Sequence, residues 1–217
     1  MFSVRRAVEA DLEEIILLQN RIWADLSDKS TLQISTPCFI NYCLRGGGIV
    51  YVVHSAGRLV GYRFVYFPRD RAFNLARGRL ANNELAYVAH LDTTCFVPEW
   101  RGKGLGKFLA HTALSEVQKL GLHHVFATVA PNNIASMRAM FASGLEIIDF
   151  DPDFKGKERY IFYRRLGGDA LEPGDVKGAM NLHPSNTRDM HACLKSGFKA
   201  IGLRKCEAGW TFELIGS

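Results

Sequence analysis

Long apolar runs are missing from this chain of 217 residues. No run approaches the roughly 20 residues that a helix needs to cross a bilayer, and residues 1–6 (MFSVRR) lack the apolar stretch of a secretory signal. The five cysteines are an odd set without the spacing of a disulfide framework, which favours reduced thiols. The sequence therefore predicts a cytoplasmic protein without a membrane partner.

Two other patterns are also absent. Basic and aromatic residues do not interleave, so the net charge of +5, which is spread along the chain, suits a polyphosphate ligand better than a nucleic acid. The neighbours His123 and His124 would point to opposite faces of a strand and could not hold one ion together, so we expect no metal site. The 47% hydrophobic content can bury one good core, with room for an appendage.

The most informative stretch is the glycine-rich segment 97–106, VPEWRGKGLG. An apolar run (91–97) precedes it, and an amphipathic helical pattern (105–120) follows it. Because glycines leave backbone N–H groups accessible at the start of a helix, where the dipole favours an anion, the segment predicts a cradle for a pyrophosphate. Its glycines and cations are Arg101, Gly102, Lys103, Gly104, Gly106 and Lys107.

Hydrophobic periodicity predicts a mixed α/β order around this segment. Asp11 is expected to cap the first helix, with Glu14 in a capping-box position, and the SAGR segment at 55–58 is expected to turn a hairpin. The insert 69–83, with four arginines, is either a solvated loop or a flap that recognises an acidic group. Strands are predicted at 2–8, 49–53, 59–67, 85–97, 125–129, 146–150 and 160–166, and helices at 105–120, at 134–142 and after Asp11.

Two motifs together carry a family resemblance. The segment RGKGLG at 101–106 fits the pattern Gln/Arg-x-x-Gly-x-Gly/Ala between a strand and a helix. An Asn, a small residue three positions later and a helix ending in Gly follow at Asn133, Ser136 and Gly144, with Leu145 where an aromatic residue is usual. With the strand order, these motifs resemble the GNAT superfamily of acetyl-CoA-dependent N-acetyltransferases over residues 3–166. The resemblance implies a GNAT-like α/β fold, with a central mixed, mostly antiparallel sheet flanked by helices.

The resemblance also implies how acetyl-CoA is held. Backbone N–H groups of 101–106 would bind its pyrophosphate, and Asn133 would reach the pantetheine arm. That arm would borrow main-chain groups near Phe96 and Val97 as though adding a strand. The implied cofactor-binding residues are Phe96, Val97, Arg101, Gly102, Lys103, Gly104, Leu105, Gly106, Lys107, Asn133 and Ser136.

Amine attack on a thioester needs a base and stabilisation of the oxyanion. The candidate bases on the strand that enters the loop are Asp92, which we favour, then His90 and, further back, Glu84. Each also has a structural interpretation: an ion pair for Asp92, a hydrogen-bonded strand residue for His90 and a solvated side chain for Glu84. Cys95, beside the site, is expected to be a packed strand cysteine rather than a nucleophile.

The leaving thiolate also needs a proton. Many members of the resembled family carry a tyrosine seven residues after the Asn, and this chain has Met140 at that position. Three possibilities stay open: another donor such as Tyr160 or Tyr163 acts, CoA leaves as the thiolate, or catalysis is feeble.

The last part of the sequence repeats an earlier part. Residues 184–198 align with 131–145 at a spacing of 53, with identical residues at 184, 186, 190, 192, 196 and 197. We expect an acetyltransferase unit at 1–166, a linker at 167–178 and a partial repeat at 179–217 that forms a β-α-β extension. The repeat lacks the glycine loop, and it is expected to dock on the first unit or on a second chain in a homodimer. Asn186 is expected to be a helix cap.

The sequence therefore predicts an acyl-CoA-dependent N-acetyltransferase. It would move an acetyl group from acetyl-CoA to a primary amine, on a small molecule or a peptide, by direct attack in a ternary complex. The alternative, suggested by Met140, is a module of the same fold that senses acyl-CoA or grips a partner without turnover.

Overall fold

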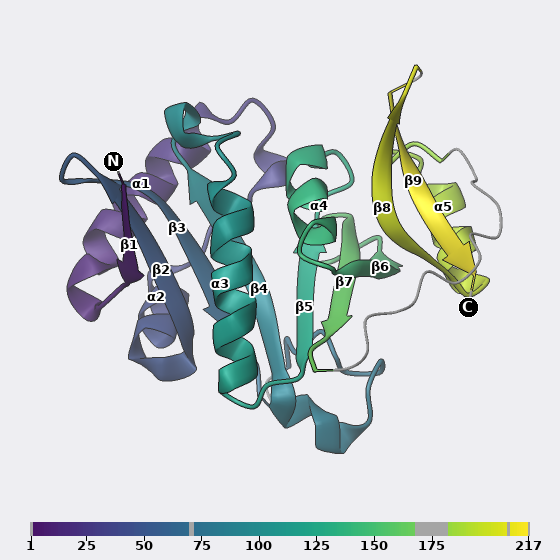
Figure 1. Cartoon of the computed structure of the whole chain (residues 1–217), viewed down its shortest axis with the longest axis horizontal. Helices are drawn as coiled ribbons and strands as arrows, with labels where there is room; N and C mark the ends of the chain where they lie inside the picture. The colour runs from purple at the N-terminus through teal and green to yellow at the C-terminus, as the bar shows by residue number, and fades with distance from the viewer. Residues whose placement is uncertain (1, 70–71, 168–181, 208, 217) are drawn as a thin grey trace.

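The computed structural model describes residues 2–69, 72–167, 182–207 and 209–216. Over these residues the chain forms one sheet of nine strands in the order β1-β2-β3-β4-β5-β7-β6-β8-β9, with helices on both faces (Figure 1). Neighbouring strands are antiparallel except β4 and β5. The predicted mixed, mostly antiparallel α/β fold is confirmed. None of the described helices is long and apolar enough to cross a membrane.

The elements follow the predicted order and differ mainly at their ends. The strands are β1 (Ser3–Arg6), β2 (Gly48–Ser55), β3 (Arg58–Tyr66), β4 (Val88–Phe96), β5 (His124–Val129), β6 (Glu146–Asp151), β7 (Arg159–Arg165), β8 (Phe198–Cys206) and β9 (Gly209–Gly216). The helices are α1 (Leu12–Asp25), α2 (Pro37–Tyr42), α3 (Leu105–Lys119), α4 (Ile134–Phe141) and α5 (Thr187–Lys195).

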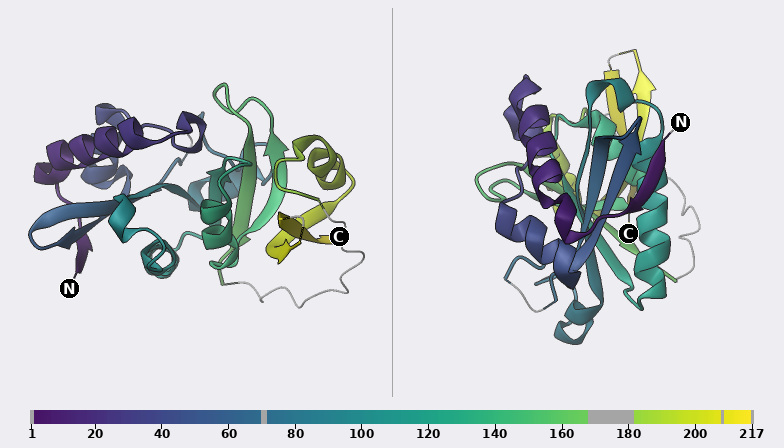
Figure 2. Two further views of the ribbon diagram at one scale, coloured as in Figure 1. Left: turned by 90° about the horizontal axis from the view of Figure 1, so that it is seen from above. Right: turned by 90° about the vertical axis from the view of Figure 1, so that its left-hand side faces the viewer.

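Helices cover both faces of the central strands, and α1 and α3 lie on opposite sides of them in the right-hand view of Figure 2. Helix α3 buries residues spaced four apart, such as Leu105, Leu109 and Ala113, as its apolar periodicity predicts. The predicted hairpin is also confirmed: Ala56 and Gly57 both have positive φ (48° and 73°) between β2 and β3, the conformation that a two-residue hairpin loop requires.

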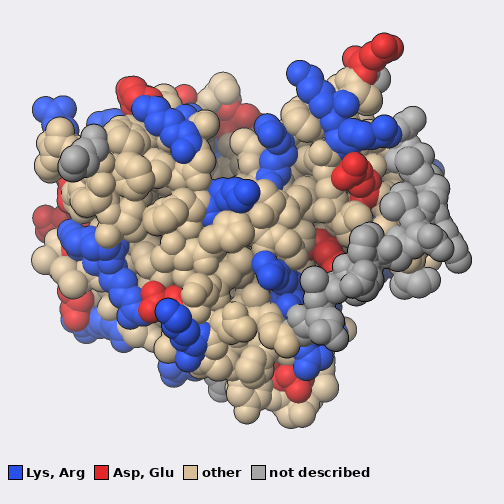
Figure 3. Space-filling model, viewed as in Figure 1, with Lys and Arg blue, Asp and Glu red and all other residues tan. Residues whose placement is uncertain are grey.

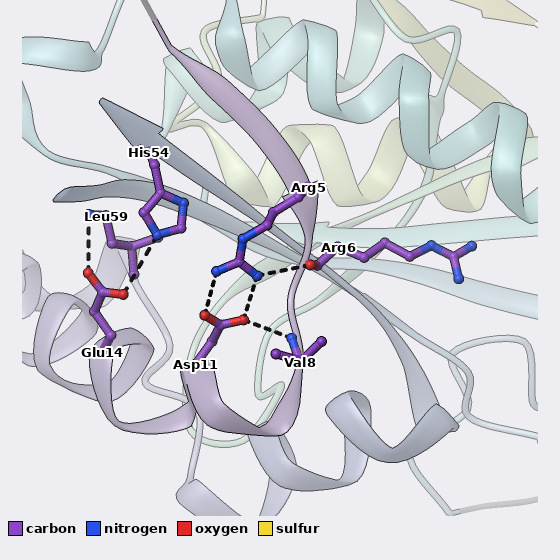
Figure 4. A network of polar contacts seen from close by, with 7 residues as sticks. All are labelled: Arg5, Arg6, Val8, Asp11, Glu14, His54 and Leu59. Carbon is purple, nitrogen blue, oxygen red and sulfur yellow. Dashed lines mark hydrogen bonds and ion pairs between the residues drawn. The ribbon is translucent and has the colours of Figure 1, made fainter. Parts of the chain in front are cut away.

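Asp11 occupies the N-cap position of α1 as predicted, but the predicted capping bond is not formed. Asp11 is itself helical and makes no cap bond to α1, because the short 3-10 helix η1 (Glu9–Asp11) precedes it. Its carboxylate turns back instead, accepting the Val8 N–H at 2.7 Å and pairing with Arg5 at 2.6 Å (Figure 4). Glu14 accepts the N–H of Leu59 and so ties α1 to β3.

Strand β4 departs from the prediction in two ways. It begins at Val88, because residues 82–87 form a 3-10 helix, η4 (Asn82–Tyr87). It also contains a bulge, which places His90 opposite Tyr66 but Thr94 opposite Arg63. Since side chains alternate along β3, the extra residue puts His90 and Thr94 on opposite faces of the sheet, and the predicted shared face is wrong.

The insert between β3 and β4 is not a solvated loop. Its residues Leu75 and Ala76 are buried in a small second core with Phe126, and its Asn74 side chain is also buried. Arg79 pairs with Asp149 on β6 at 2.5 Å, so its charge is matched within the protein. The insert is therefore a packed cover over the sheet.

The C-terminal segment extends the sheet beyond β6. Strand β8 runs antiparallel to β6, and β9 completes the edge (Figure 1). Asn186 caps α5 by accepting the N–H of Asp189 at 3.3 Å, as expected. Residues 168–178 of the predicted linker lie outside the described residues.

Candidate active site

A large cavity opens where β4 and β5 separate. These strands pair in parallel only at Val88–His90 with 124–126, and the residues that follow on each strand line the cavity. Its volume is about 1350 Å³, above the range of about 300–1,000 Å³ typical of single-ligand pockets. The cavity therefore has room for a cofactor and a second substrate.

The glycine loop forms part of the wall of this cavity. Gly102 and Gly104 have φ of 71° and 77°, a left-handed conformation that favours glycine. A Cβ at either position would meet no atom within 4 Å, so the space above the loop is open. Helix α3 begins directly after Gly104, which provides no side-chain cap for the first N–H groups of the helix. This geometry is compatible with the predicted phosphate cradle, which stays a prediction.

The structure brings together nine of the eleven predicted cofactor-binding residues on the cavity wall. Val97 is not on the wall, and its N–H donates to the carbonyl of Val60 at 3.0 Å. Lys103 is also absent, and its Nζ lies 4.6 Å from the ring centre of Trp100. The nine that line the cavity are Phe96, Arg101, Gly102, Gly104, Leu105, Gly106, Lys107, Asn133 and Ser136.

Two of these residues have clear structural bonds. The Nε of Arg101 donates to the carbonyl of Phe96 at 2.9 Å and so fixes the loop to the end of β4. The side-chain oxygen of Asn133 accepts the N–H of Ser136 at 3.0 Å and caps α4. Asn133 therefore presents its amide at the start of a helix that borders the cavity.

Sequence reasoning missed Arg63. This arginine of β3 is 1% exposed and lines the cavity below the first turn of α3. Its Nη1 donates to the carbonyl of Gly106 at 3.3 Å, but Nε and Nη2 have no partner among the described residues. Burial lowers the pKa of its guanidinium to about 10, so it stays charged at neutral pH. A lone arginine in the apolar run 59–67 is a signal that could have identified it.

Asp92 lies exposed on the cavity wall at the β4 bulge. Its Oδ1 accepts two bonds from Thr93, from the N–H at 2.7 Å and from the hydroxyl at 2.9 Å. No described residue donates to Oδ2. The carboxylate is thus held by one oxygen, and the other is available to a ligand or to water.

His90 also lines the cavity, but its ring is buried between Tyr66 and Phe126. Its Nε2 accepts the N–H of Leu75 at 3.2 Å, so that lone pair is already used. Burial, helped by the charge of Lys155, lowers the pKa of the imidazole to about 3. This environment keeps His90 neutral and favours Asp92 as the base.

Because His90 is buried in its neutral form, the folded protein should lose stability at acidic pH. In the unfolded chain the pKa of the imidazole returns to about 6.5. Between pH 6.5 and pH 3 the unfolded chain therefore binds a proton at His90 that the folded chain does not bind. The free energy of unfolding falls as the pH drops through this range. His90→Gln keeps an acceptor for the N–H of Leu75. Between pH 7 and pH 4.5, we expect the free energy of unfolding of this variant to fall by about 2–3 kcal/mol less than that of the wild type. Urea unfolding at both pH values measures this, with the exposed His111→Gln as control. Equal losses in wild type and His90→Gln would contradict the assignment.

Glu84 lies outside the cavity. It belongs to η4 rather than to a strand, and its Oε2 is 2.9 Å from Nε2 of His124. The other ring nitrogen of His124 is 3.0 Å from the hydroxyl of Tyr163. Glu84 thus takes part in a structural chain of polar contacts at the far end of β5.

Neither tyrosine considered as a proton donor reaches the cavity beside Met140. Met140 lines the cavity, whereas Tyr160 and Tyr163 do not. The hydroxyl of Tyr160 donates to the carbonyl of Pro184 at 2.9 Å, and that of Tyr163 contacts His124. Cys95 is on the wall but is 6% exposed, and burial raises the pKa of its thiol to about 11, as a packed cysteine requires.

Two segments that the sequence suggested as borders of the site, the insert and the partial repeat, both contribute to the cavity wall. The insert contributes Phe73 and Leu75, and the β8–β9 hairpin contributes Gly202, Leu203 and Glu213.

Among the described residues, no group of three or more His, Cys, Asp or Glu side chains could hold a metal ion.

Comparison with known proteins identifies similar folds. A GNAT-family acetyltransferase from Streptococcus pneumoniae is 17% identical, with a TM-score of 0.60 over 77% of this chain and 100% of the other. A putative acetyltransferase from Salmonella typhimurium, solved with acetyl-CoA, is 20% identical, with a TM-score of 0.60 over 81% and 99%. An aminoglycoside acetyltransferase, solved with coenzyme A and kanamycin, is 14% identical, with a TM-score of 0.57 over 76% and 96%.

No protein of curated function matches the chain. Residues 12–143 match the family described as the acetyltransferase (GNAT) family. This match covers more than half of the chain and includes the glycine loop, Asp92 and α4. The protein therefore belongs to the acetyltransferase (GNAT) family.

Proposed function

We propose that this protein is an N-acetyltransferase that moves an acetyl group from acetyl-CoA to a primary amine by direct attack in a ternary complex. The observation that carries the proposal is that the glycine loop and Asp92 both line one cavity. A phosphate site joined to a base in a cavity large enough for two substrates fits this reaction better than it fits a simple anion site.

The chain's own residues fit a polyphosphate cofactor. The cradle is open, and the guanidinium of Arg63 is buried beside it with two unpaired nitrogens. An unpaired buried charge is costly, and an anionic or strongly polar ligand would offset that cost. The wall also carries six cationic side chains against the two carboxylates of Asp92 and Glu213. The six are Arg63, Arg101, Lys107, Arg138, Lys155 and Arg159.

Different parts of the cavity wall have separate tasks. The N–H groups of residues 102–106 bind the pyrophosphate, whereas the N–H of Arg101 already donates to the carbonyl of Pro98 at 3.1 Å. Asn133 approaches the pantetheine arm. Bound acetyl-CoA supplies the activated acetyl group. Asp92, directly or through a water on Oδ2, takes the proton from the amine as the new C–N bond forms. Met140 offers no proton, so CoA leaves as the thiolate and is protonated by solvent.

The acceptor binds on the α1–α2 side. Phe39, Tyr66 and Phe73 give this part of the cavity an aromatic lining, and Lys155 lies 4.6 Å from the ring centre of Phe73. The lining fits an amine that carries an apolar group, on a small molecule or at the end of a peptide. Two solved neighbours act on an aminoglycoside and a ribosomal-protein alanine, so the fold accommodates both sizes of acceptor.

CoA release on addition of amines tests the proposal. We expect a thiol-reactive dye to detect turnover with at least one member of a panel of amino acids, peptides, polyamines and aminoglycosides. Tight acetyl-CoA binding without turnover on the whole panel would favour the sensor alternative instead.

On the face seen in Figure 3, Lys and Arg side chains are scattered rather than gathered in a stripe, so that face offers no continuous track for a nucleic acid. Five free cysteines fit a reducing compartment, and we place the protein in the cytoplasm.

Replacing Arg63 should change affinity and stability in opposite directions. We expect Arg63→Met to weaken acetyl-CoA binding by about 10- to 100-fold, the value of one or two charged hydrogen bonds. The melting temperature of the ligand-free protein should rise, because a buried unpaired charge is removed. Calorimetric titration and thermal unfolding measure the two effects, with the exposed Arg58→Met on the same strand as control. Unchanged affinity would remove Arg63 from the site.

A further inference from the structure

Two segments of the chain have the same local structure at the sequence spacing of 53. Asn133 caps α4 and Asn186 caps α5, each through its side-chain oxygen and the N–H three residues later. Gly144 and Gly197 follow the two helices with φ of 74° and 89°. The repeated residues therefore perform the same structural roles in both segments.

The strands that follow also correspond. Helix α4 leads into the antiparallel pair β6–β7, and α5 leads into the antiparallel pair β8–β9. Each pair has one irregularity in register, after Ile147 in β6 and after Ala200 in β8. Because 147 and 200 differ by 53, even this bulge recurs at the equivalent position. We call α4–β6–β7 and α5–β8–β9 the two half-units.

The two half-units meet as symmetric partners. The single register pair between β6 and β8 joins Ile147 to Ala200, which are equivalent residues. The ion pair beside it joins Glu146 to Lys199 at 3.2 Å, which are equivalent too. In a twofold interface, the residues on the axis face their own counterparts. The axis of a pseudo-twofold therefore passes through this point.

Away from the axis, the packing of whole elements is reciprocal, as twofold symmetry requires, although the aromatic partners of the two helices are not equivalent residues. Helix α4 packs on β8, and α5 packs on β6. Arg138 of α4 lies over the ring of Trp210 on β9 at 4.9 Å, while His191 of α5 contacts the ring of Phe150 on β6 at 5.5 Å. Arg138 and His191 are themselves 53 residues apart, so equivalent helix positions reach across to the opposite half-unit.

The axial residues explain why the chain pairs with itself. If a second copy of the chain docked on β6 in this way, Ile147 would lie directly opposite its own counterpart, and the two Glu146 side chains would be diagonal neighbours across the axis, as Glu146 and Lys199 are here. Like charges this close repel each other, and two isoleucines need more room than the present pair. In the second half-unit these positions are Lys199 and Ala200, which are complementary to β6 in charge and in volume.

We propose that the half-unit at 182–216 takes the place of a second subunit. It closes the β6 edge as a symmetric partner would, and Lys199 and Ala200 select it over a second copy of the chain. Its hairpin also supplies Gly202, Leu203 and Glu213 to the wall of the cavity. The protein is accordingly a monomer at this edge, with a built-in partner that completes its site. This inference does not depend on which reaction the cavity supports.

Charge reversal in the full-length chain tests the pairing. In Lys199→Glu and in Glu146→Lys, like charges become diagonal neighbours across the axis. We expect amide hydrogen exchange to become faster in both β6 and β8–β9, on the order of tenfold, within the coupling expected of contacting residues. The double variant Glu146→Lys with Lys199→Glu restores an opposite pair and should restore slow exchange. Light scattering should show the wild type as a monomer from micromolar to near-millimolar concentration.

A matched control separates the axial pair from a general effect of charge. Lys205→Glu makes the same charge change on the same strand, at an exposed position near the hairpin turn, and should leave exchange in β6 unchanged. The proposal is overturned if the single charge reversals leave amide exchange in β6 and β8–β9 as slow as in the wild type. It is also overturned if the double variant does not recover slow exchange. A wild-type chain that dimerises through β6 would also overturn it.

Discussion

Gly104→Asp is expected to abolish acetyl-CoA binding. The side chain would project into the open space above the loop, where a Cβ meets no atom and where the proposed pyrophosphate lies. A carboxylate about 4 Å from a phosphate charge costs about 4 kcal/mol at the effective dielectric of a protein surface. That cost corresponds to a loss of about 1000-fold in affinity, which calorimetric titration with acetyl-CoA would record as no measurable binding.

The same helix supplies a control for backbone strain. Gly121 follows the other end of α3 and has φ of 74°, and a Cβ at this position would meet no atom within 4 Å. Gly121→Asp therefore imposes similar strain and the same charge far from the cradle, and it should bind acetyl-CoA like wild type. Wild-type affinity in Gly104→Asp would show that the loop is not the phosphate site, whereas equal losses in both variants would point to misfolding.

The parts of the structure that depend on local sequence were predictable. The glycine loop, α3 and the hairpin at Ala56 and Gly57 each follow from residues that are neighbours in the chain. The repeat at a spacing of 53 was likewise visible, and its cap at Asn186 formed as expected. The capping bond was not predictable: Asp11 stands at the N-cap of α1 as expected, but its carboxylate bonds Val8 and Arg5 instead of the helix.

The parts that depend on contacts between distant residues were not predictable. The β4 bulge arises from pairing with β3, and it alone separates His90 from Thr94. Arg63 became a candidate for the site only when α3 was seen to cover it. The insert looked like a solvated loop because its arginines suggested exposure, but Leu75 and Ala76 fill the space over Phe126. Such pairings leave no periodicity in the sequence.

Asp92→Asn is expected to lower kcat by on the order of 100-fold or more, the usual contribution of a general base. The amide keeps an oxygen for the two bonds from Thr93, so β4 and the bound cofactor should be unaffected. The affinity for acetyl-CoA should accordingly stay within about threefold of wild type, because no interaction with the phosphates is removed. Glu13→Gln, an exposed carboxylate of α1, provides the control for the loss of one negative charge.

The pH dependence of kcat distinguishes a base from a residue that merely positions the amine. If Asp92 removes the proton, the variant loses the dependence on its ionisation, so the shape of the pH–rate profile changes as well as its height. His90 cannot take over, because its Nε2 is bonded to Leu75 and its imidazole is held neutral by burial. A variant with reduced kcat and an unaltered profile would therefore assign Asp92 to orienting the amine and leave proton removal to solvent.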